Sequence, residues 1–285
     1  MKLKGKRAVV TGASQGLGRN IAELFAQEGA DLLICGRNKD DLTAAQQQIM
    51  GNSERRVFAE AADVSLESDV KRLADVAAGQ LGGVDILVCN AGVYGPKGAI
   101  DELNWTEWVQ AININLLGTV LCCRLFLRLL RESRCGKIIL LSGGGATKPL
   151  PFLSAYAASK AAVVRFGETL AEELRGDSID VNSVAPGALN TRMLQEVLDA
   201  GPETVGAAFY GASLKQRDSG GTPLETGAGL CLYLASDESN GITGKLISAV
   251  WDPWANFQTY RDDLDKSDVF TLRRIVPGER GLTWG

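Results

Sequence analysis

Tyr156 and Lys160 are the residues of this chain whose types and spacing most directly suggest chemistry. They lie four residues apart in the sequence Tyr-Ala-Ala-Ser-Lys, so on a helix both side chains would project from one face. A phenol has a pKa of about 10 in water, and a neighbouring cation favours the phenolate. Such a tyrosine can serve as a general acid or base near neutral pH. The pair alone is weak evidence, because tyrosine and lysine at this spacing are common on solvated helices.

A glycine-rich loop near the N-terminus suggests where a ligand would bind. An apolar run at 8–10 fits a buried parallel strand, and residues 19–28 carry apolar side chains at helical spacing. Between them stands Thr-Gly-x-x-x-Gly-x-Gly, which differs from the common Gly-x-Gly-x-x-Gly. Glycines there permit a tight turn and the close approach of a pyrophosphate to a helix N-terminus. An ordinary strand-to-helix turn is the alternative. The loop positions predicted to bind a dinucleotide are Gly12, Ser14, Gln15, Gly16, Leu17 and Gly18.

Further short motifs follow the glycine loop, before and after the Tyr/Lys pair. They are Asp63-Val64, Cys89-Asn90-Ala91-Gly92, Asn115-Leu116-Leu117-Gly118, Pro186-Gly187 and Ile242-Thr243-Gly244. Together with the loop and the pair, these motifs resemble the short-chain dehydrogenase/reductase family over residues 4–249. The resemblance implies an α/β, single-domain Rossmann fold, in which a doubly wound parallel sheet has helices on both faces. It also implies an NAD(P)-dependent oxidoreductase acting on alcohol or carbonyl groups.

The same resemblance implies catalytic roles. Tyr156 would exchange a proton with the substrate oxygen, and Lys160 would lower the pKa of Tyr156 and bind the nicotinamide ribose. Asn115 resembles the family residue that holds a water in the proton relay, although it could simply be a satisfied polar group of its helix.

Cofactor-binding positions are carried over in the same way. Asp63 and Val64 resemble the pair that holds the adenine ring, and residues 90–92 resemble the segment against the adenosine ribose. Leu189 and Thr191 resemble the groups that bind the nicotinamide carboxamide. Each has a structural alternative, such as the pairing of Asn90 with backbone groups at a strand end. Beyond the glycine loop, the implied positions are Asp63, Val64, Asn90, Ala91, Gly92, Tyr156, Lys160, Pro186, Gly187, Leu189 and Thr191.

Ser142 marks a departure from the family pattern. The family usually has a substrate-orienting serine 13 residues before the tyrosine, where this chain has Gly143, and Ser142 stands 14 residues before it. The glycines at 143–145 can absorb one extra residue as a bulge, so we expect Ser142 to bind the substrate oxygen. If Ser142 points away, a backbone N–H of the glycine run would serve instead. Ser154 is expected to cap the catalytic helix.

Arg37 bears on the choice between NAD and NADP. It follows the predicted second strand, at the point where an NAD-specific site has an acidic residue for the ribose 2′-OH. An arginine there can pair with a 2′-phosphate, and no carboxylate occurs at 34–39. We therefore predict NADP(H) in preference to NAD(H), with a solvated loop cation as the alternative. Asp40 and Asp41 are expected to begin the next helix.

Strand and helix patterns alternate along the chain, as a doubly wound parallel sheet requires. Strands are expected near 7–11, 31–35, 56–60, 85–89, 136–141, 179–184 and 245–249. Helices are expected near 17–28, 39–50, 66–80, 105–131, 154–175 and 224–235. Residues 1–250 would form one domain, and residues 251–285 a C-terminal extension.

Composition excludes several other functions. The chain contains no histidine, which rules out a Ser-His-Asp triad, a His-x-x-x-His zinc site and any histidine base. A net charge of −4 gives no reason to expect nucleic-acid binding. No run of 18 apolar residues occurs, so no membrane span is expected. The six cysteines include no Cys-x-x-Cys pair and are read as buried free thiols of a cytoplasmic protein.

Two regions are expected to decide the substrate. Residues 190–222 have a glycine-containing composition suited to a mobile lid, and Lys215 and Arg217 could face an anion. An apolar wall is expected from Met193, Leu194, Val197, Leu198, Phe209 and Tyr210. The extension carries aromatic residues that argue against disorder, so it should pack on the body or on a neighbouring subunit. Its Arg273 or Arg274 could bind a phosphate or carboxylate, although an oligomer clamp is the alternative.

These observations predict an NADP-dependent reductase of ketones or aldehydes, or the reverse alcohol dehydrogenase, acting on a small molecule. Reduction of 3-oxoacyl thioesters is the nearest alternative, and a sensor or scaffold that binds NADP without turnover is the alternative of another class. Apolar residues of the helix at 105–131, on more than one face, suggest a homodimer or homotetramer, as is common in the family.

Overall fold

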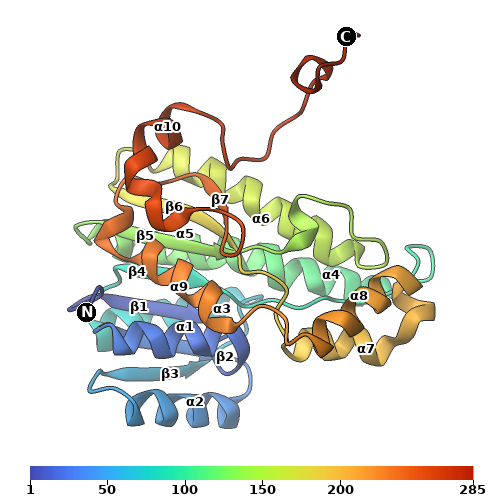
Figure 1. Cartoon of the computed structure of the whole chain (residues 1–285). Coiled ribbons are helices and arrows are strands. Elements are labelled where there is room, and N and C mark those ends of the chain that lie inside the picture. Colours follow the sequence, from blue (N-terminus) through green and yellow to red (C-terminus); the bar gives the residue numbers. More distant parts are fainter. Residues whose placement is uncertain (285) are drawn as a thin grey trace.

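A computed structural model describes residues 1–284 and contains one parallel sheet of seven strands, in the order β3-β2-β1-β4-β5-β6-β7 (Figure 1). The strand order reverses between β1 and β4, which is where open α/β sheets bind ligands. The predicted fold is confirmed, and each predicted strand is found with both ends within one residue. The strands are β1 (Arg7–Thr11), β2 (Asp31–Gly36), β3 (Val57–Ala61), β4 (Ile86–Cys89), β5 (Gly136–Leu141), β6 (Ile179–Ala185) and β7 (Lys245–Ser248).

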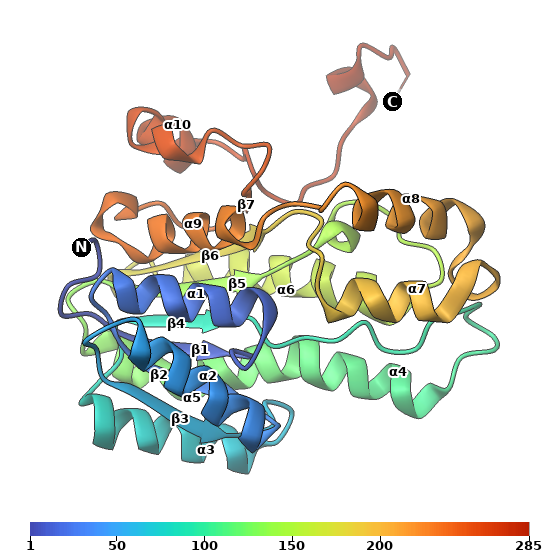
Figure 2. The same ribbon diagram turned by 60° about the horizontal axis from the view of Figure 1, so that its bottom comes forward.

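Helices cover both faces of the sheet (Figure 2). Helices α1, α2 and α9 pack on one face, and α3, α5 and α6 pack on the other. The helices are α1 (Gly16–Gln27), α2 (Lys39–Gly51), α3 (Glu67–Val76), α4 (Trp105–Ile112), α5 (Gly118–Arg131), α6 (Ser154–Glu173), α7 (Arg192–Val205), α8 (Ala207–Asp218), α9 (Leu224–Ala235) and α10 (Arg261–Lys266).

The central strands supply two hydrophobic cores, because successive side chains of a strand point to opposite faces. In β1, Val10 belongs to the core under α1 and α9, whereas Val9 belongs to the core under α3 and α5. Leu32 and Leu33 of β2 divide in the same way. Strands buried on both faces must be apolar throughout, which explains their continuous apolar runs in the sequence.

The helix predicted at 105–131 is interrupted by one π-helical turn, Asn113–Leu117, between α4 and α5. A second π turn, Ala77–Leu81, ends the helix predicted at 66–80. Within residues 1–284, only Trp105–Arg131 is long and apolar enough to cross a membrane by length and composition. Of its most apolar window, 44% is buried inside the protein, and core helices of globular proteins meet the same criterion.

The segment predicted as a mobile lid contains two helices, α7 and α8. Gly201 interrupts α7 with φ 76° and ψ 165°, directly before Pro202. A left-handed φ is easy only for glycine, so the kink is tied to this residue.

The C-terminal extension packs on the body as far as Leu272. Phe257 and Leu264 are buried in the core beside α9. The backbone N–H of Leu246 in β7 donates to the carbonyl of Phe270 at 2.7 Å. The last part of the extension, toward the C-terminus, runs away from the body (Figure 1).

Candidate active site

A single cavity of about 1100 Å³ lies at the carboxyl ends of the strands. It gathers almost every site residue that the sequence singled out, from segments far apart in the chain. Those lining it are Gly12, Ser14, Gln15, Gly16, Leu17, Gly18, Arg37, Asp63, Val64, Asn90, Ala91, Gly92, Ser142, Tyr156, Lys160, Pro186, Gly187, Leu189 and Thr191. Asn115 alone of the predicted set does not line it.

The glycine loop is held in place by contacts that leave no room for side chains. Gly12 has φ +64°, and a Cβ there would lie 2.8 Å from the Cα of Ala91. A Cβ at Gly18 would overlap the carbonyl oxygen of Gly12 and the amide nitrogen of Asn90. The Asn90 side chain donates to the carbonyls of Thr11 and Gly12, each at 3.0 Å. Asn90 therefore ties β4 to the loop, as its structural alternative supposed.

The N-terminus of α1 points its free N–H groups toward this loop. No side chain among residues 1–284 caps it, and its first turn contains no acidic residue. Uncapped N–H groups and the helix dipole favour an anion at this place. With the crowded glycines beside it, the loop fits the pyrophosphate of a dinucleotide.

Side chains of opposite charge line the cavity at the end of β2. Arg37 lines the cavity, and so does Asp41 in the first turn of α2. Asn38 caps this helix by accepting from the N–H groups of Asp40 and Asp41, so the prediction that the acids begin the helix is confirmed. Asp41 is nevertheless a carboxylate within the cavity, which the sequence did not indicate.

Asp63 and Val64 follow β3 at the same edge. The Asp63 carboxylate accepts from the N–H and hydroxyl groups of Ser65, at 2.9 and 2.7 Å. Val64 packs on Gly118, where a Cβ would lie 2.8 Å from the valine side chain. Gly118 of the Asn-Leu-Leu-Gly motif thus lets α5 approach the cavity floor.

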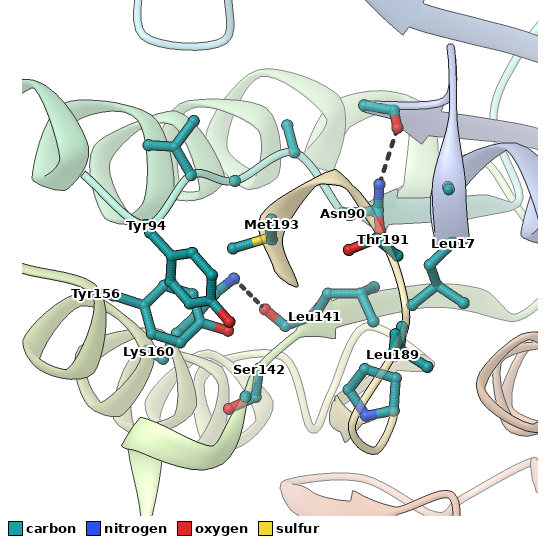
Figure 3. A pocket seen from close by; sticks show the side chains of 18 of the residues that line it. Leu17, Asn90, Tyr94, Leu141, Ser142, Tyr156, Lys160, Leu189, Thr191 and Met193 are labelled. Atoms are coloured by element: carbon teal, nitrogen blue, oxygen red, sulfur yellow. Dashed lines mark hydrogen bonds between the residues drawn. The ribbon is translucent and has the colours of Figure 1, made fainter. Parts of the chain in front are cut away.

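Tyr156 and Lys160 lie in α6 with both side chains toward the cavity (Figure 3). The Lys160 ammonium lies 5.8 Å from the centre of the Tyr156 ring and donates to the carbonyl of Leu141 at 2.7 Å. Burial lowers the pKa of Lys160 to about 8. Burial also raises the pKa of Tyr156, with a smaller contribution from Tyr94. The expected lowering of the Tyr156 pKa is wrong for the protein alone, because burial raises this pKa and Lys160 donates to the Leu141 carbonyl and not to the phenol.

Asn115 sits in the π turn and is fully buried. Its amide oxygen accepts from the N–H of Val93 at 2.8 Å, and its amide nitrogen donates to the carbonyl of Val93 and the hydroxyl of Ser159, both at 2.9 Å. The side chain is thus fully engaged within the protein. Asn115 thus joins the segment at Val93, which lies beside the cavity, to Ser159 of α6.

Ser142 lines the cavity, but its hydroxyl oxygen is buried and has no hydrogen-bond partner among the described residues. At Gly143 a Cβ would overlap the hydroxyl oxygen of Tyr156. The phenol therefore occupies the space in which a side chain at 143 would stand. The Ser142 hydroxyl makes no hydrogen bond to Tyr156, and its binding of a substrate oxygen stays a prediction.

Ser154 does not cap α6, so that prediction is wrong. Leu153 is the N-cap residue, and Ser154 is already inside the helix. The Ser154 hydroxyl instead accepts from the indole N–H of Trp108 at 3.0 Å, which ties α4 to α6.

The substrate end of the cavity is bounded by α7 and α8. Met193, Leu194, Val197 and Phe209 line it as predicted, whereas Leu198 and Tyr210 do not. The two predicted loop cations are also absent from the lining, and Arg217 pairs with Asp218 at 2.8 Å. Neither Arg273 nor Arg274 lines the cavity, and Arg273 pairs with Asp268 and Glu279 of the extension.

Several lining residues were not foreseen, chiefly Tyr94, Lys148, Gln216 and Trp251. Tyr94 had a usable signal, because it stands two residues after Asn90-Ala91-Gly92, at the end of a predicted strand. Lys148 and Gln216 lie outside every motif, so only the fold reveals them.

Comparison with known proteins agrees with this geometry. A family model for short chain dehydrogenases matches residues 6–201. Glucose 1-dehydrogenase of Gluconobacter oxydans is 37% identical over 86% of this chain and 91% of its own length. A 3-oxoacyl-[acyl-carrier-protein] reductase of Chlamydia trachomatis is 32% identical over 86% of this chain and 96% of its own length. A solved short-chain type dehydrogenase/reductase from Mycobacterium marinum is 31% identical, with a TM-score of 0.77 over 87% of this chain and 94% of that one.

The match extends over more than half of the chain and over nearly the full length of these relatives. The chain therefore belongs to the short-chain dehydrogenase family, as an NAD(P)-dependent oxidoreductase that acts on CH–OH and C=O groups.

Proposed function

We propose that the protein is an NADPH-dependent carbonyl reductase that converts a ketone or aldehyde to an alcohol, or catalyses the reverse reaction. The observation that carries the proposal is that one cavity contains both the glycine loop at the N-terminus of α1 and the Tyr156/Lys160 pair. A dinucleotide bound along the loop and a carbonyl group beside the phenol would both fit in this space.

NADPH supplies a hydride when bound, and the chain supplies the proton. Tyr156 donates its hydroxyl proton to the carbonyl oxygen, so that C=O, hydride and proton together give CH–OH. Burial raises the pKa of Tyr156, so the phenol holds its proton at neutral pH, as a general acid for reduction must. Lys160 is charged below its pKa of about 8, and its positive charge favours the phenolate left after transfer.

Arg37 supports the choice of NADPH. Its guanidinium can pair in a bidentate manner with a 2′-phosphate, whereas the nearby Asp41 carboxylate would repel that phosphate and could accept from a 2′-OH. Both residues line the cavity. The first lies directly after β2 and the second in the first turn of α2, so the two can be separated by mutation.

A fluorescence titration with NADPH and NADH tests this choice. We expect the protein to bind NADPH more tightly, and Arg37→Ala to lose about 10- to 100-fold in NADPH affinity, as for a hydrogen bond to a charged group. Asp41→Asn is the matched control, which should not weaken NADPH binding. Equal or tighter NADH binding by the unmodified protein would contradict the proposal.

Reduction of 3-oxoacyl thioesters is the second candidate, and two observations favour it. The Chlamydia relative is named for this reaction. The wall formed by Met193, Leu194, Val197 and Phe209 is apolar, which suits an acyl chain better than a sugar. Turnover of acetoacetyl-coenzyme A, compared with glucose and simple ketones, distinguishes the two substrate classes.

A homodimer or homotetramer in the cytoplasm completes the proposal. Trp105 and Leu117, on the α4–α5 segment, are 68% and 48% exposed, so apolar surface is free there to meet a second copy. All six cysteines are free, as a reducing compartment requires. A mass measurement in solution checks the oligomeric state.

A further inference from the structure

Tyr94 is a second phenol beside Tyr156, and no motif of the chain accounts for it. The two rings meet edge to face, with centroids 4.7 Å apart, and both line the cavity. Both rings direct their hydroxyl groups to the same side in Figure 3. Neither hydroxyl has a hydrogen-bond partner in the part of the chain that the structure describes, residues 1–284. A ligand oxygen between them would find two donors.

The serine hydroxyl expected at this point is not available. Gly143 has no side chain, and its missing Cβ position is filled by the Tyr156 hydroxyl. The Ser142 oxygen is enclosed by protein, with no partner among residues 1–284. A substrate oxygen at Tyr156 therefore needs its second hydrogen bond from elsewhere.

Tyr94 is held firmly enough to provide that bond. The preceding residue, Val93, is fixed by both of its hydrogen bonds to Asn115. The following residue, Gly95, has φ +74°, and a Cβ there would lie 2.6 Å from the Cβ of Ala111. Lys97 lies 5.7 Å from the centre of the Tyr94 ring and pairs with Glu196 of α7 at 3.5 Å. A donor fixed before the reaction begins costs little reorganisation when charge develops.

The protonation state of Tyr94 also suits a donor. Burial raises its pKa, and the negative charge of Glu196 raises it further. The phenol therefore keeps its proton across the neutral range.

We propose that the Tyr94 hydroxyl donates a hydrogen bond to the carbonyl oxygen of the substrate while Tyr156 transfers its proton to the same oxygen. Tyr94 then takes the part that a serine has in the family, stabilising the negative charge that develops as hydride arrives. Its own proton stays on Tyr94, so the products are unchanged. The inference rests on the proposed reductase function.

Tyr94→Phe tests the inference, because it removes one oxygen and keeps the ring against Tyr156. We expect turnover of 9,10-phenanthrenequinone or acetoacetyl-coenzyme A by the NADPH-loaded enzyme to fall about 100-fold, as for loss of one oxyanion donor. The Kd for NADPH should not change. Tyr260→Phe, in the exposed part of the extension, is the matched control and should turn over normally. Ser142→Ala tests the rival hydroxyl and should cost far less than Tyr94→Phe.

Two other results would overturn the inference in distinguishable ways. If Tyr94→Phe stays within about threefold of the unmodified enzyme while Ser142→Ala loses about 100-fold, the serine hydroxyl is the donor. The proposed function would then stand. If the unmodified enzyme reduces neither probe, or Tyr156→Phe retains turnover, the proposed function fails and takes this inference with it.

Discussion

The two ends of the cavity are built in different ways. At the cofactor end, backbone groups meet the ligand space, and a Cβ on Gly12 or Gly18 would strike other backbone atoms. The polar side chain that holds the loop is satisfied, because Asn90 donates to the carbonyls of Thr11 and Gly12. At the catalytic end, side chains meet the ligand space, and Ser142 leaves a buried oxygen without a partner in the described chain.

The two ends also differ in how well their groups are satisfied before a ligand binds. The cofactor end is complete as a packed structure and only has to receive phosphates. The catalytic end holds a buried lysine of lowered pKa and a buried phenol of raised pKa, arrangements that cost stability until a ligand uses them. Substitutions at the catalytic end should therefore impair chemistry, whereas substitutions at the cofactor end should impair folding and cofactor binding.

Tyr156→Phe should give the largest effect, and this effect should be confined to the chemical step. Loss of a general acid costs about 10²- to 10⁴-fold in turnover, so we expect about 1000-fold, or about 4 kcal/mol. The affinity for NADPH and the thermal midpoint should stay near those of the unmodified protein, because the ring contact with Tyr94 is kept. Steady-state kinetics and an NADPH titration on one preparation measure both. A variant that keeps turnover would remove Tyr156 from the mechanism.

Gly18→Ala should give the next largest effect, which should appear in folding stability and in cofactor binding. The new methyl group would overlap the Gly12 carbonyl oxygen and the Asn90 amide, both of which are fixed. Overpacking of this kind costs about 1–3 kcal/mol, and we expect about 3 kcal/mol with loss of measurable NADPH binding. Urea unfolding and fluorescence titration provide the values.

Gly211→Ala in α8 is the matched control for this glycine. A Cβ there meets no atom of the described chain within 4 Å, so alanine should stabilise the helix by about 0.5–1 kcal/mol. Equal effects of the two substitutions would mean that the glycine loop relaxes freely, and the contrast between the two ends would be lost.

The same contrast explains which parts of the molecule were predictable from sequence. Strands buried on both faces must be continuously apolar, so β1 and β4 could be located from their short apolar runs in the sequence. The glycine loop is local in sequence, and its geometry follows from three glycines and the helix behind them. The positions of the glycine loop could therefore be predicted from the sequence as lining of the cavity, whereas Asp41 at the same end could not.

The catalytic end depends on contacts between distant segments, and there sequence reasoning failed. The bond from Lys160 to the Leu141 carbonyl depends on the packing of α6 against β5, and no spacing rule reveals it. The overlap between Gly143 and Tyr156 also exists only in three dimensions. The π turn that holds Asn115 breaks a pattern that reads as one continuous helix. Pattern-based prediction locates elements, whereas packing decides which hydroxyl is free.

Lys160→Met should change stability by less than Gly18→Ala, and the dependence of that change on pH makes it informative. Burial lowers the pKa of Lys160 from 10.5 to about 8, so the folded protein holds this proton more weakly than the unfolded chain. At 1.36 kcal/mol per pKa unit, burial of the charged lysine lowers the stability of the folded protein by about 3 kcal/mol below pH 8. Replacing Lys160 removes this cost, but it also removes the hydrogen bond to the Leu141 carbonyl, which is worth about 1 kcal/mol. The variant should therefore be more stable by about 2 kcal/mol at pH 7 in the absence of cofactor.

That advantage should shrink as the pH rises from about 8 toward 10.5, because the unfolded chain then holds more protons than the folded protein and the unmodified protein gains stability. Urea unfolding at pH 7, 9 and 10 measures the change. Lys71→Met, on the exposed side of α3, controls for the loss of one positive charge. A gap between Lys160→Met and the unmodified protein that stays constant with pH would mean that Lys160 remains charged when folded. The carbonyl of Leu141 would then hold a full cation at the catalytic end, and that end would be as well satisfied as the glycine loop.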